Sequence, residues 1–236
     1  EKAANLRADH PEIYKVLGLN HARAGSLVES EKAFRRASEL DPFNWELHYL
    51  YGRALYELRH YQESETALHQ AIQLNANSVR AWTALGQTQE TLHDPAGAEA
   101  SYRKALELCG KQTRDCAWPL LQLGFLSSRH KDMRAAESYF RQAVAARPEW
   151  AKSHFYLGKT LASLGDFVGA RGAIEAALRL DGGKSEYHYQ ISQVYRRLRD
   201  IKKAEKHLLR YQELRKLERQ RKTSSEFGVP DEALIP

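Results

Sequence analysis

The sequence repeats itself every 34 residues along most of its length. The stretch "FRRASELDP" begins at Phe34, "YRKALELCG" at Tyr102 and "FRQAVAARP" at Phe140. The first two lie 68 residues apart, which is two steps of 34, and the third follows after 38, one step plus four. A fixed period of this length indicates a stacked repeat, because each unit exposes an apolar face that only its neighbour can cover.

Rows of 34 residues that start at Pro11, with a four-residue slip at 113–116, give a constant pattern. Position 8 is small in every row: Gly18, Gly52, Gly86, Gly124, Gly158 and Ser192. Position 24 is bulky: Phe34, Leu68, Tyr102, Phe140, Ile174 and Leu208. Position 20 is Ser or Ala, and position 27 is Ala in five rows before it breaks at Tyr211. Small residues opposite a bulky one predict two antiparallel helices in close contact.

This pattern resembles the tetratricopeptide repeat family. The first row matches the family pattern at six positions and has Ser30 at a seventh: Tyr14, Leu17, Gly18, Phe34, Ala37 and Pro42. The resemblance implies an all-α fold, a right-handed superhelical solenoid of antiparallel helix pairs. We expect six units, at residues 11–44, 45–78, 79–112, 117–150, 151–184 and 185–218.

The two ends depart from the full repeat. Residues 1–10 fit the later part of a second helix, and we interpret them as the remnant of an upstream repeat; the alternative is a complete N-terminal cap. After the sixth unit, residues 219–222 are expected to end an elongated polar helix that shields the last apolar face. Residues 223–236 contain Gly and two Pro and are expected to form an irregular tail.

Charge and hydropathy narrow the function classes. The formal net charge is +6, and residues 184–222 hold 13 Lys and Arg against 5 Asp and Glu, a net of +8. This basic face is either simply solvated or contacts an anionic partner. Nucleic acid is disfavoured, since the sequence holds no recognised nucleic-acid-binding module. No apolar run approaches the length of a membrane span.

The two cysteines flank the single insertion in the array. Cys109 closes a second helix and Cys116 precedes the next repeat. They either form a disulfide that clamps the lengthened turn or remain two unrelated thiols. A disulfide would imply an oxidising, extracytoplasmic compartment; otherwise the cytoplasm is the default.

The sequence offers no site for catalysis. His48, His154 and His188 occupy position 4, where the family places an aromatic packing residue, so we interpret them as packing residues rather than metal ligands. No pair of His stands at i, i+4, and no Cys-x-x-Cys, phosphate loop or nucleophile elbow occurs. We therefore expect a protein that is not an enzyme and needs no cofactor or metal.

The resemblance implies a concave inner face lined by positions 2, 5, 9, 12 and 13 of each first helix. Aromatic residues and Arg at these positions are the types that anchor protein interfaces. The candidate groove residues are Tyr49, Arg53, Tyr56, Arg80, Gln87, Trp118, Phe125, Arg129, Lys152, Phe155, Lys159, Tyr189 and Arg196. The alternative is that several of them pack against neighbouring first helices and are structural, Tyr56 above all.

These features predict a non-catalytic scaffold that binds an extended peptide or partner segment with apolar and acidic residues. The alternative is a regulatory or targeting module of a larger enzyme or of a secretion or assembly complex. Two binding modes of the family are absent: Leu19 and Leu50 replace the Asn residues of the carboxylate clamp, and position 6 carries no ladder of Asn. The apolar, acidic tail at 223–236 could also mediate self-association by entering the groove of a second copy.

Overall fold

The computed structural model describes residues 10–110 and 114–226, and all the regular secondary structure there is helical. The helices are α2 (Pro11–Arg23), α3 (Leu27–Leu40), α4 (Trp45–Glu57), α5 (Tyr61–Leu74), α6 (Val79–Thr91), α7 (Pro95–Leu108), α8 (Ala117–Arg129), α9 (Met133–Ala146), α10 (Ala151–Ser163), α11 (Phe167–Leu180), α12 (Ser185–Arg197) and α13 (Ile201–Glu226), with a 3-10 turn, η1 (Arg114–Cys116). The predicted all-α fold is confirmed. No helix in these segments is both long and apolar enough to cross a membrane.

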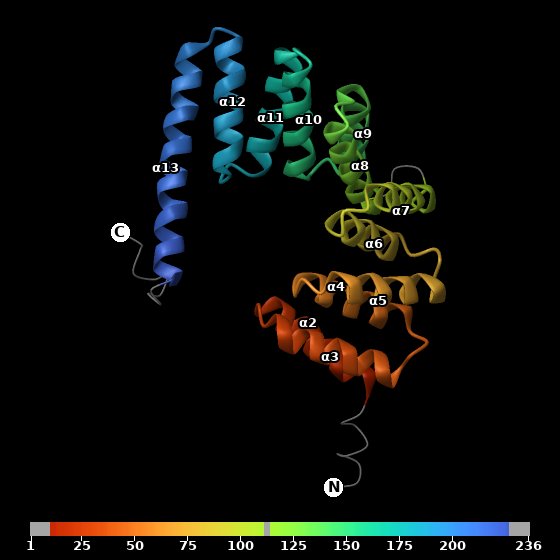
Figure 1. Ribbon diagram of the computed structural model, residues 1–236. Helices are drawn as coiled ribbons and strands as arrows, with labels where there is room; N and C mark the ends of the chain where they lie inside the picture. The colour runs from red at the N-terminus through yellow and green to blue at the C-terminus, as the bar shows by residue number, and fades with distance from the viewer. Residues whose placement is uncertain (1–9, 111–113, 227–236) are drawn as a thin grey trace. The chain divides into compact units, whose positions relative to one another are not determined.

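The chain divides into two compact units, unit 1 up to Leu126 and unit 2 from Ser127. Within unit 1, α2 pairs with α3, α4 with α5 and α6 with α7. Within unit 2, α10 pairs with α11 and α12 with α13. Figure 1 shows the antiparallel course of these pairs. The second helix of one pair packs on the first helix of the next, α3 on α4 and α5 on α6 in unit 1, and α9 on α10 and α11 on α12 in unit 2.

Positions 8 and 24 are in close contact in four of the helix pairs, α2 with α3, α4 with α5, α6 with α7 and α10 with α11. A Cβ built on Gly86 would lie 2.6 Å from the ring of Tyr102, and one on Gly158 would lie 2.5 Å from Ile174. Both bulky partners are completely buried. Since the backbone of the first helix lies directly on the bulky side chain of the second, Gly86 and Gly158 have no room for a side chain unless their neighbours move.

The turn between the two helices of a pair has a left-handed residue at position 15. Its φ angle is 66° at Arg59, 62° at His93, 63° at Lys131 and 62° at Arg199, and Gly25 and Gly165 fill the same place. At Arg59 the N–H bonds the Tyr56 carbonyl, which is the usual left-handed helix end. The sequence pattern did not reveal this turn, because Gly occupies the position in only two of six repeats.

One prediction about the C-terminal end needs correction, and one alternative left open for the cysteines is decided. Helix α13 continues to Glu226, four residues beyond the predicted end at 222, because no helix-breaking residue precedes Gly228. The rest of the predicted tail, and residues 1–9 of the predicted remnant, lie outside the described residues. Cys109 and Cys116 are buried thiols and not a disulfide, and the Cys116 Sγ is directed at the carbonyl oxygen of Gly110, 3.4 Å away.

Candidate functional site

The side chains at position 4 are structural. The Nε2 atom of His48 lies 2.9 Å from the Pro42 carbonyl oxygen, and that of His154 lies 2.8 Å from the Pro148 carbonyl oxygen. Trp82, at the same position of its repeat, donates from Nε1 to the carbonyl oxygen of Ala76 at 2.8 Å. These bonds tie each first helix to the turn before it and support the interpretation of the histidines as packing residues.

The described residues bring together no cluster of metal-binding side chains. In residues 10–110 and 114–226, no group of three or more His, Cys, Asp or Glu side chains is arranged to hold a metal ion. The charged side chains instead pair mostly along helix surfaces, as Arg103 does with Glu99 at 2.7 Å.

In unit 1 the two predicted groove tyrosines of α4 pack partly against neighbouring side chains of the fold. The Tyr56 ring packs edge-on against Tyr61, with centroids 5.4 Å apart, and its hydroxyl lies 3.3 Å from Thr91 Oγ1. Tyr49 packs against the buried cluster around Leu68 and Leu85. Both side chains remain half-buried, so each also presents part of its ring to solvent.

A hollow opens between α2, α3 and α4, which we call the unit 1 hollow. Its volume is about 410 Å³. The apolar part of its lining is Leu19, Ala22, Leu27, Leu50 and Ala54, and its polar part includes Arg53 and Glu57. Three of these residues, Leu19, Arg53 and Glu57, stand at the inner-face positions 9 and 13. On α2 and α4, Lys15 and Glu46 form an ion pair at 2.8 Å, and the hydrogen bond to Glu46 raises the pKa of Lys15.

The other unit 1 candidates lie on α6 and α8. Arg80 is exposed and Gln87 is half-buried on α6. Trp118 and Phe125 on α8 are half-buried, so each presents part of its ring to solvent. These four positions stay candidates for partner contact.

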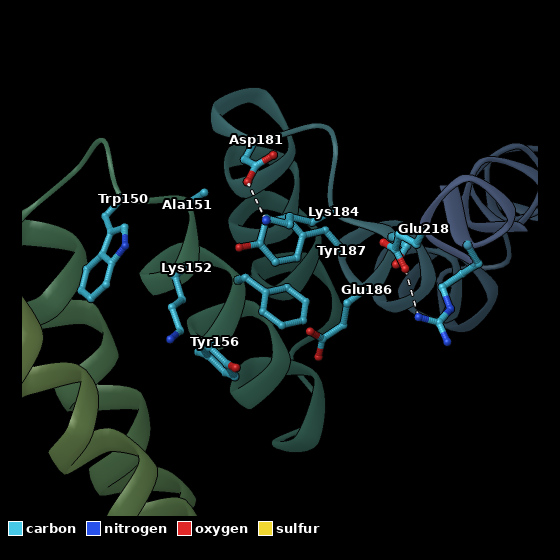
Figure 2. A pocket seen from close by; sticks show the side chains of 12 residues that line it. Trp150, Ala151, Lys152, Tyr156, Asp181, Lys184, Glu186, Tyr187 and Glu218 are labelled. Atoms are coloured by element: carbon cyan, nitrogen blue, oxygen red, sulfur yellow. Dashed lines mark hydrogen bonds and ion pairs between the residues drawn. The ribbon is translucent and has the colours of Figure 1, made fainter. Parts of the chain in front are cut away.

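Unit 2 has its own hollow, at the N-terminal ends of α10 and α12 and against α13, which we call the unit 2 hollow. Its volume is about 590 Å³. Figure 2 shows Lys152 and Tyr156 on α10, with Glu186 reaching toward them from α12. On α13, Arg215 and Glu218 line the hollow as an ion pair at 3.0 Å. The hollow thus combines aromatic rings with both signs of charge.

Burial changes the acid–base properties of two groups in the unit 2 hollow. It lowers the pKa of the Lys152 ammonium, which is half-buried. It raises the pKa of the Tyr156 hydroxyl, and the nearby Glu186 carboxylate raises it further. A partly desolvated ammonium favours an anionic group close by, because the lost water stabilised its charge.

Phe155 borders the unit 2 hollow but is almost completely buried. Only 1% of it is exposed, and its ring stacks on Tyr187 with centroids 4.4 Å apart and planes inclined by 25°. Position 5 of this first helix therefore packs against the next first helix instead of facing a partner. Tyr189, in contrast, is 44% exposed beside Tyr211, and the remaining unit 2 candidates, Arg129, Lys159 and Arg196, are exposed.

Comparison with known families agrees with this geometry. A family model described as tetratricopeptide repeat matches residues 15–65, 49–112 and 129–185, and a second model of the same description matches 185–216. The chain belongs to the tetratricopeptide repeat family. Proteins of this family bind protein partners, and the family is generally a non-catalytic scaffold.

Relatives of this tetratricopeptide repeat chain are much longer proteins. It is 32% identical over 96 residues to RNA polymerase II-associated protein 3 of Xenopus tropicalis, which covers 41% of this chain and 15% of that protein. It is 23% identical over 178 residues to Protein O-mannosyl-transferase TMTC3 of Mus musculus, covering 71% of this chain and 19% of that protein. The chain spans less than a fifth of the length of either relative.

Solved tetratricopeptide repeat structures share the fold. PilF of Pseudomonas aeruginosa superposes with a TM-score of 0.78 at 16% identity, over 91% of this chain and 97% of that one. YrrB, described as a protein with an unusual peptide-binding site, superposes with a TM-score of 0.60 at 19% identity, over 78% and 93% of the two chains. At these identities the likeness shows the fold alone.

The last tetratricopeptide repeat contains a histidine pair that the sequence pattern did not indicate. The Nδ1 atoms of His188 on α12 and His207 on α13 lie 2.9 Å apart. His188 Nε2 faces the Gly182 carbonyl oxygen at 3.2 Å, so this nitrogen carries the proton and Nδ1 accepts from His207. If both rings were protonated, two N–H groups would point at each other across this distance.

We expect this pair to make stability depend on pH. Burial lowers the pKa of both rings. Arg210 lowers the pKa of His188 further, while His188 and Lys206 lower the pKa of His207 and Glu175 raises it. Because the unfolded histidines bind protons near pH 6.5 and the folded pair only at lower pH, the stabilisation is complete above pH 6.5 and is lost as pH falls below it. Thermal unfolding midpoints at pH 7.5 and 5.5 test this prediction.

A double variant, His188→Gln with His207→Gln, provides the control for the histidine pair. It should show a smaller drop in midpoint between the two pH values than the unmodified chain does. Equal drops in the two proteins would contradict the assignment of the pH dependence to this pair.

Proposed function

We propose that this chain is a non-catalytic scaffold that binds an extended protein segment along the inner face of its first helices. The main support is that each unit has a hollow whose lining includes side chains at positions 2, 9 or 13, which the family resemblance assigns to the inner face. Aromatic and cationic candidates next to these hollows are half-buried or exposed, as expected of surfaces that bury further area on binding.

The lining favours a partner with both apolar and acidic residues. In unit 1 the hollow offers aliphatic side chains, Leu19 and Leu50 among them, to an apolar group. In unit 2 the lining includes the cations Lys152, Lys184 and Arg215, which offer charged donors to an acidic group of the partner. A partner that carries both kinds of residue is therefore complementary to the two hollows taken separately.

Replacing Trp118 and Phe125 together by Ala tests the proposal. Peptides selected from a displayed random library against the intact chain would serve as probes, with affinity measured by calorimetry. Because truncation of an aromatic anchor typically costs at least about 2 kcal/mol, we expect the affinity to fall by roughly 30-fold or more. Helical content, measured by circular dichroism, should stay unchanged.

Phe43→Ala is the matched control, since Phe43 is 83% exposed in the turn before α4 and belongs to no first helix. The control should bind the selected peptides as the unmodified chain does. If the double variant retains full affinity, or if no peptide is selected at all, the inner face is not the binding surface.

A second candidate function is that of a targeting or regulatory module within a larger protein. It is favoured by the match to TMTC3, which covers 71% of this chain but 19% of that protein, named a transferase. The reading frame that encodes the chain would decide this: a catalytic domain joined to the repeats supports the module, and a frame of repeats alone speaks against it.

A further inference from the structure

Arg53 on α4 carries an unusual polar atom at the edge of the unit 1 hollow. The Nε atom is buried although the side chain as a whole is 43% exposed, and the chain offers it no hydrogen-bond acceptor. No other side-chain nitrogen or oxygen in the described residues is buried without such a partner. Buried donors are almost always paired in native proteins, because leaving one unpaired forfeits its hydration. An orphaned donor beside a hollow therefore indicates that an acceptor belongs there.

The guanidinium edge that contains this atom is only loosely held. The Nε–H and one Nη2–H point in the same direction, so one acceptor group can engage both. Nη2 lies 3.6 Å from the Glu57 Oε1 atom, which is an ion pair but too long for a hydrogen bond. A small rotation of the guanidinium would bring this edge to an acceptor placed in the hollow.

Apart from Glu57, Ser30 and Tyr49, the residues that line the hollow with Arg53 are apolar. Leu19, Leu50 and Ala54 line the hollow next to Arg53, and Ala22 lies at its exposed rim. A volume of about 410 Å³ accommodates a large aliphatic side chain together with its own peptide groups. Burying such a side chain against these residues removes apolar surface of both molecules from water.

The local charge selects a neutral acceptor. Arg53 already faces the Glu57 carboxylate, and Lys15 already faces Glu46 at 2.8 Å. A carboxylate placed in the hollow would be repelled by these two acidic groups. A peptide carbonyl can accept from the Arg53 edge without adding charge.

We propose, building on the proposed function, that the unit 1 hollow binds one residue of the partner with a large aliphatic side chain, whose neutral backbone carbonyl accepts a hydrogen bond from Arg53. Arg53 is then the residue that fixes the position of the partner's backbone, and the hollow is the pocket that selects its side chain. The segment recognised at unit 1 is apolar and uncharged at this point.

N-acetyl-leucine N-methylamide is the probe that tests this, because it presents the side chain and both neighbouring carbonyls without charge. Its binding would be followed in ¹⁵N–¹H spectra through the Nε–H signal of Arg53 and the backbone amides of Leu19 and Leu50. A dissociation constant of about 1 mM is expected for a ligand of so few atoms. N-acetyl-alanine N-methylamide should bind at least about tenfold more weakly, because it lacks most of the apolar surface. N-acetylleucine, which carries a carboxylate, should also bind more weakly.

Two variants separate the pocket from the hydrogen bond. Ala22→Phe fills the hollow from its rim and should abolish the spectral changes. Arg53→Lys keeps the charge but removes the paired N–H edge, and should weaken leucine-probe binding by about five- to tenfold. Arg36→Lys, on the exposed side of α3, is the matched control and should bind the probe as the unmodified chain does. Equal binding of the leucine and alanine probes, or unchanged binding in Ala22→Phe, would overturn the inference.

The outcome can be distinguished from failure of the proposed function. If selected peptides bind Ala22→Phe and Arg53→Lys at full affinity, the scaffold proposal survives and the assignment of this hollow is wrong. If the leucine probe binds as expected but no displayed peptide is captured, the hollow is assigned and the scaffold proposal is wrong.

Discussion

Replacing Tyr102 by Ala should lower the free energy of unfolding of unit 1 by about 3–5 kcal/mol. The Tyr102 side chain is completely buried between α6 and α7, and its hydroxyl donates a 2.7 Å hydrogen bond to a carboxylate oxygen of Glu90. The substitution leaves a cavity where the ring was and removes one hydrogen-bond donor to Glu90. Urea denaturation followed by circular dichroism measures the loss.

Tyr102→Phe separates the contribution of the hydroxyl from that of the ring, and Phe43→Ala provides a control. Tyr102→Phe keeps the ring and removes the hydroxyl, and we expect it to cost about 1.5–3 kcal/mol, the usual range for a hydrogen bond to a charged group. Phe43→Ala, at an aromatic that is 83% exposed, should change stability by less than about 0.5 kcal/mol. If Tyr102→Ala proved as mild as Phe43→Ala, the ring would not be the centre of this helix pair.

Gly86→Ala is expected to destabilise the chain by about 1–3 kcal/mol, although Ala is the better helix former. The added Cβ would lie 2.6 Å from the ring of Tyr102, which its hydrogen bond to Glu90 holds in place. Gly172→Ala is the matched control, because no atom lies within 4 Å of its Cβ position in the middle of α11. There the same substitution should stabilise by about 0.5–1 kcal/mol, and urea midpoints compare the two.

The two positions should also be coupled. In the Tyr102→Ala background the new Cβ of Gly86→Ala enters the cavity, so its cost should shrink or change sign. A double-mutant cycle measures this coupling. Strictly additive effects of the two substitutions would show that the close approach of positions 8 and 24 does not limit the packing.

The site could be predicted less completely than the fold. The repeat position of a residue predicted which first-helix side chains face a partner. At position 5 Tyr189 is exposed as predicted, whereas Phe155 is buried against Tyr187. The same position number thus gives an exposed ring in one repeat and a packed ring in another, depending on which side chain the next first helix presents. The unit 1 hollow and the orphaned Nε of Arg53 likewise depend on three helices meeting, which no single repeat specifies.

The amino-acid sequence by itself determined the all-α fold and the helix pairs, because the 34-residue spacing of Gly, Ala and bulky residues fixes which faces of adjacent helices must touch. It also determined that position 4 is a packing position. Only the tertiary structure decided the left-handed turn at Arg59, the thiol state of Cys116, the histidine pair and the two hollows. These features depend on distances between side chains of different helices, and a local pattern within one repeat does not contain those distances.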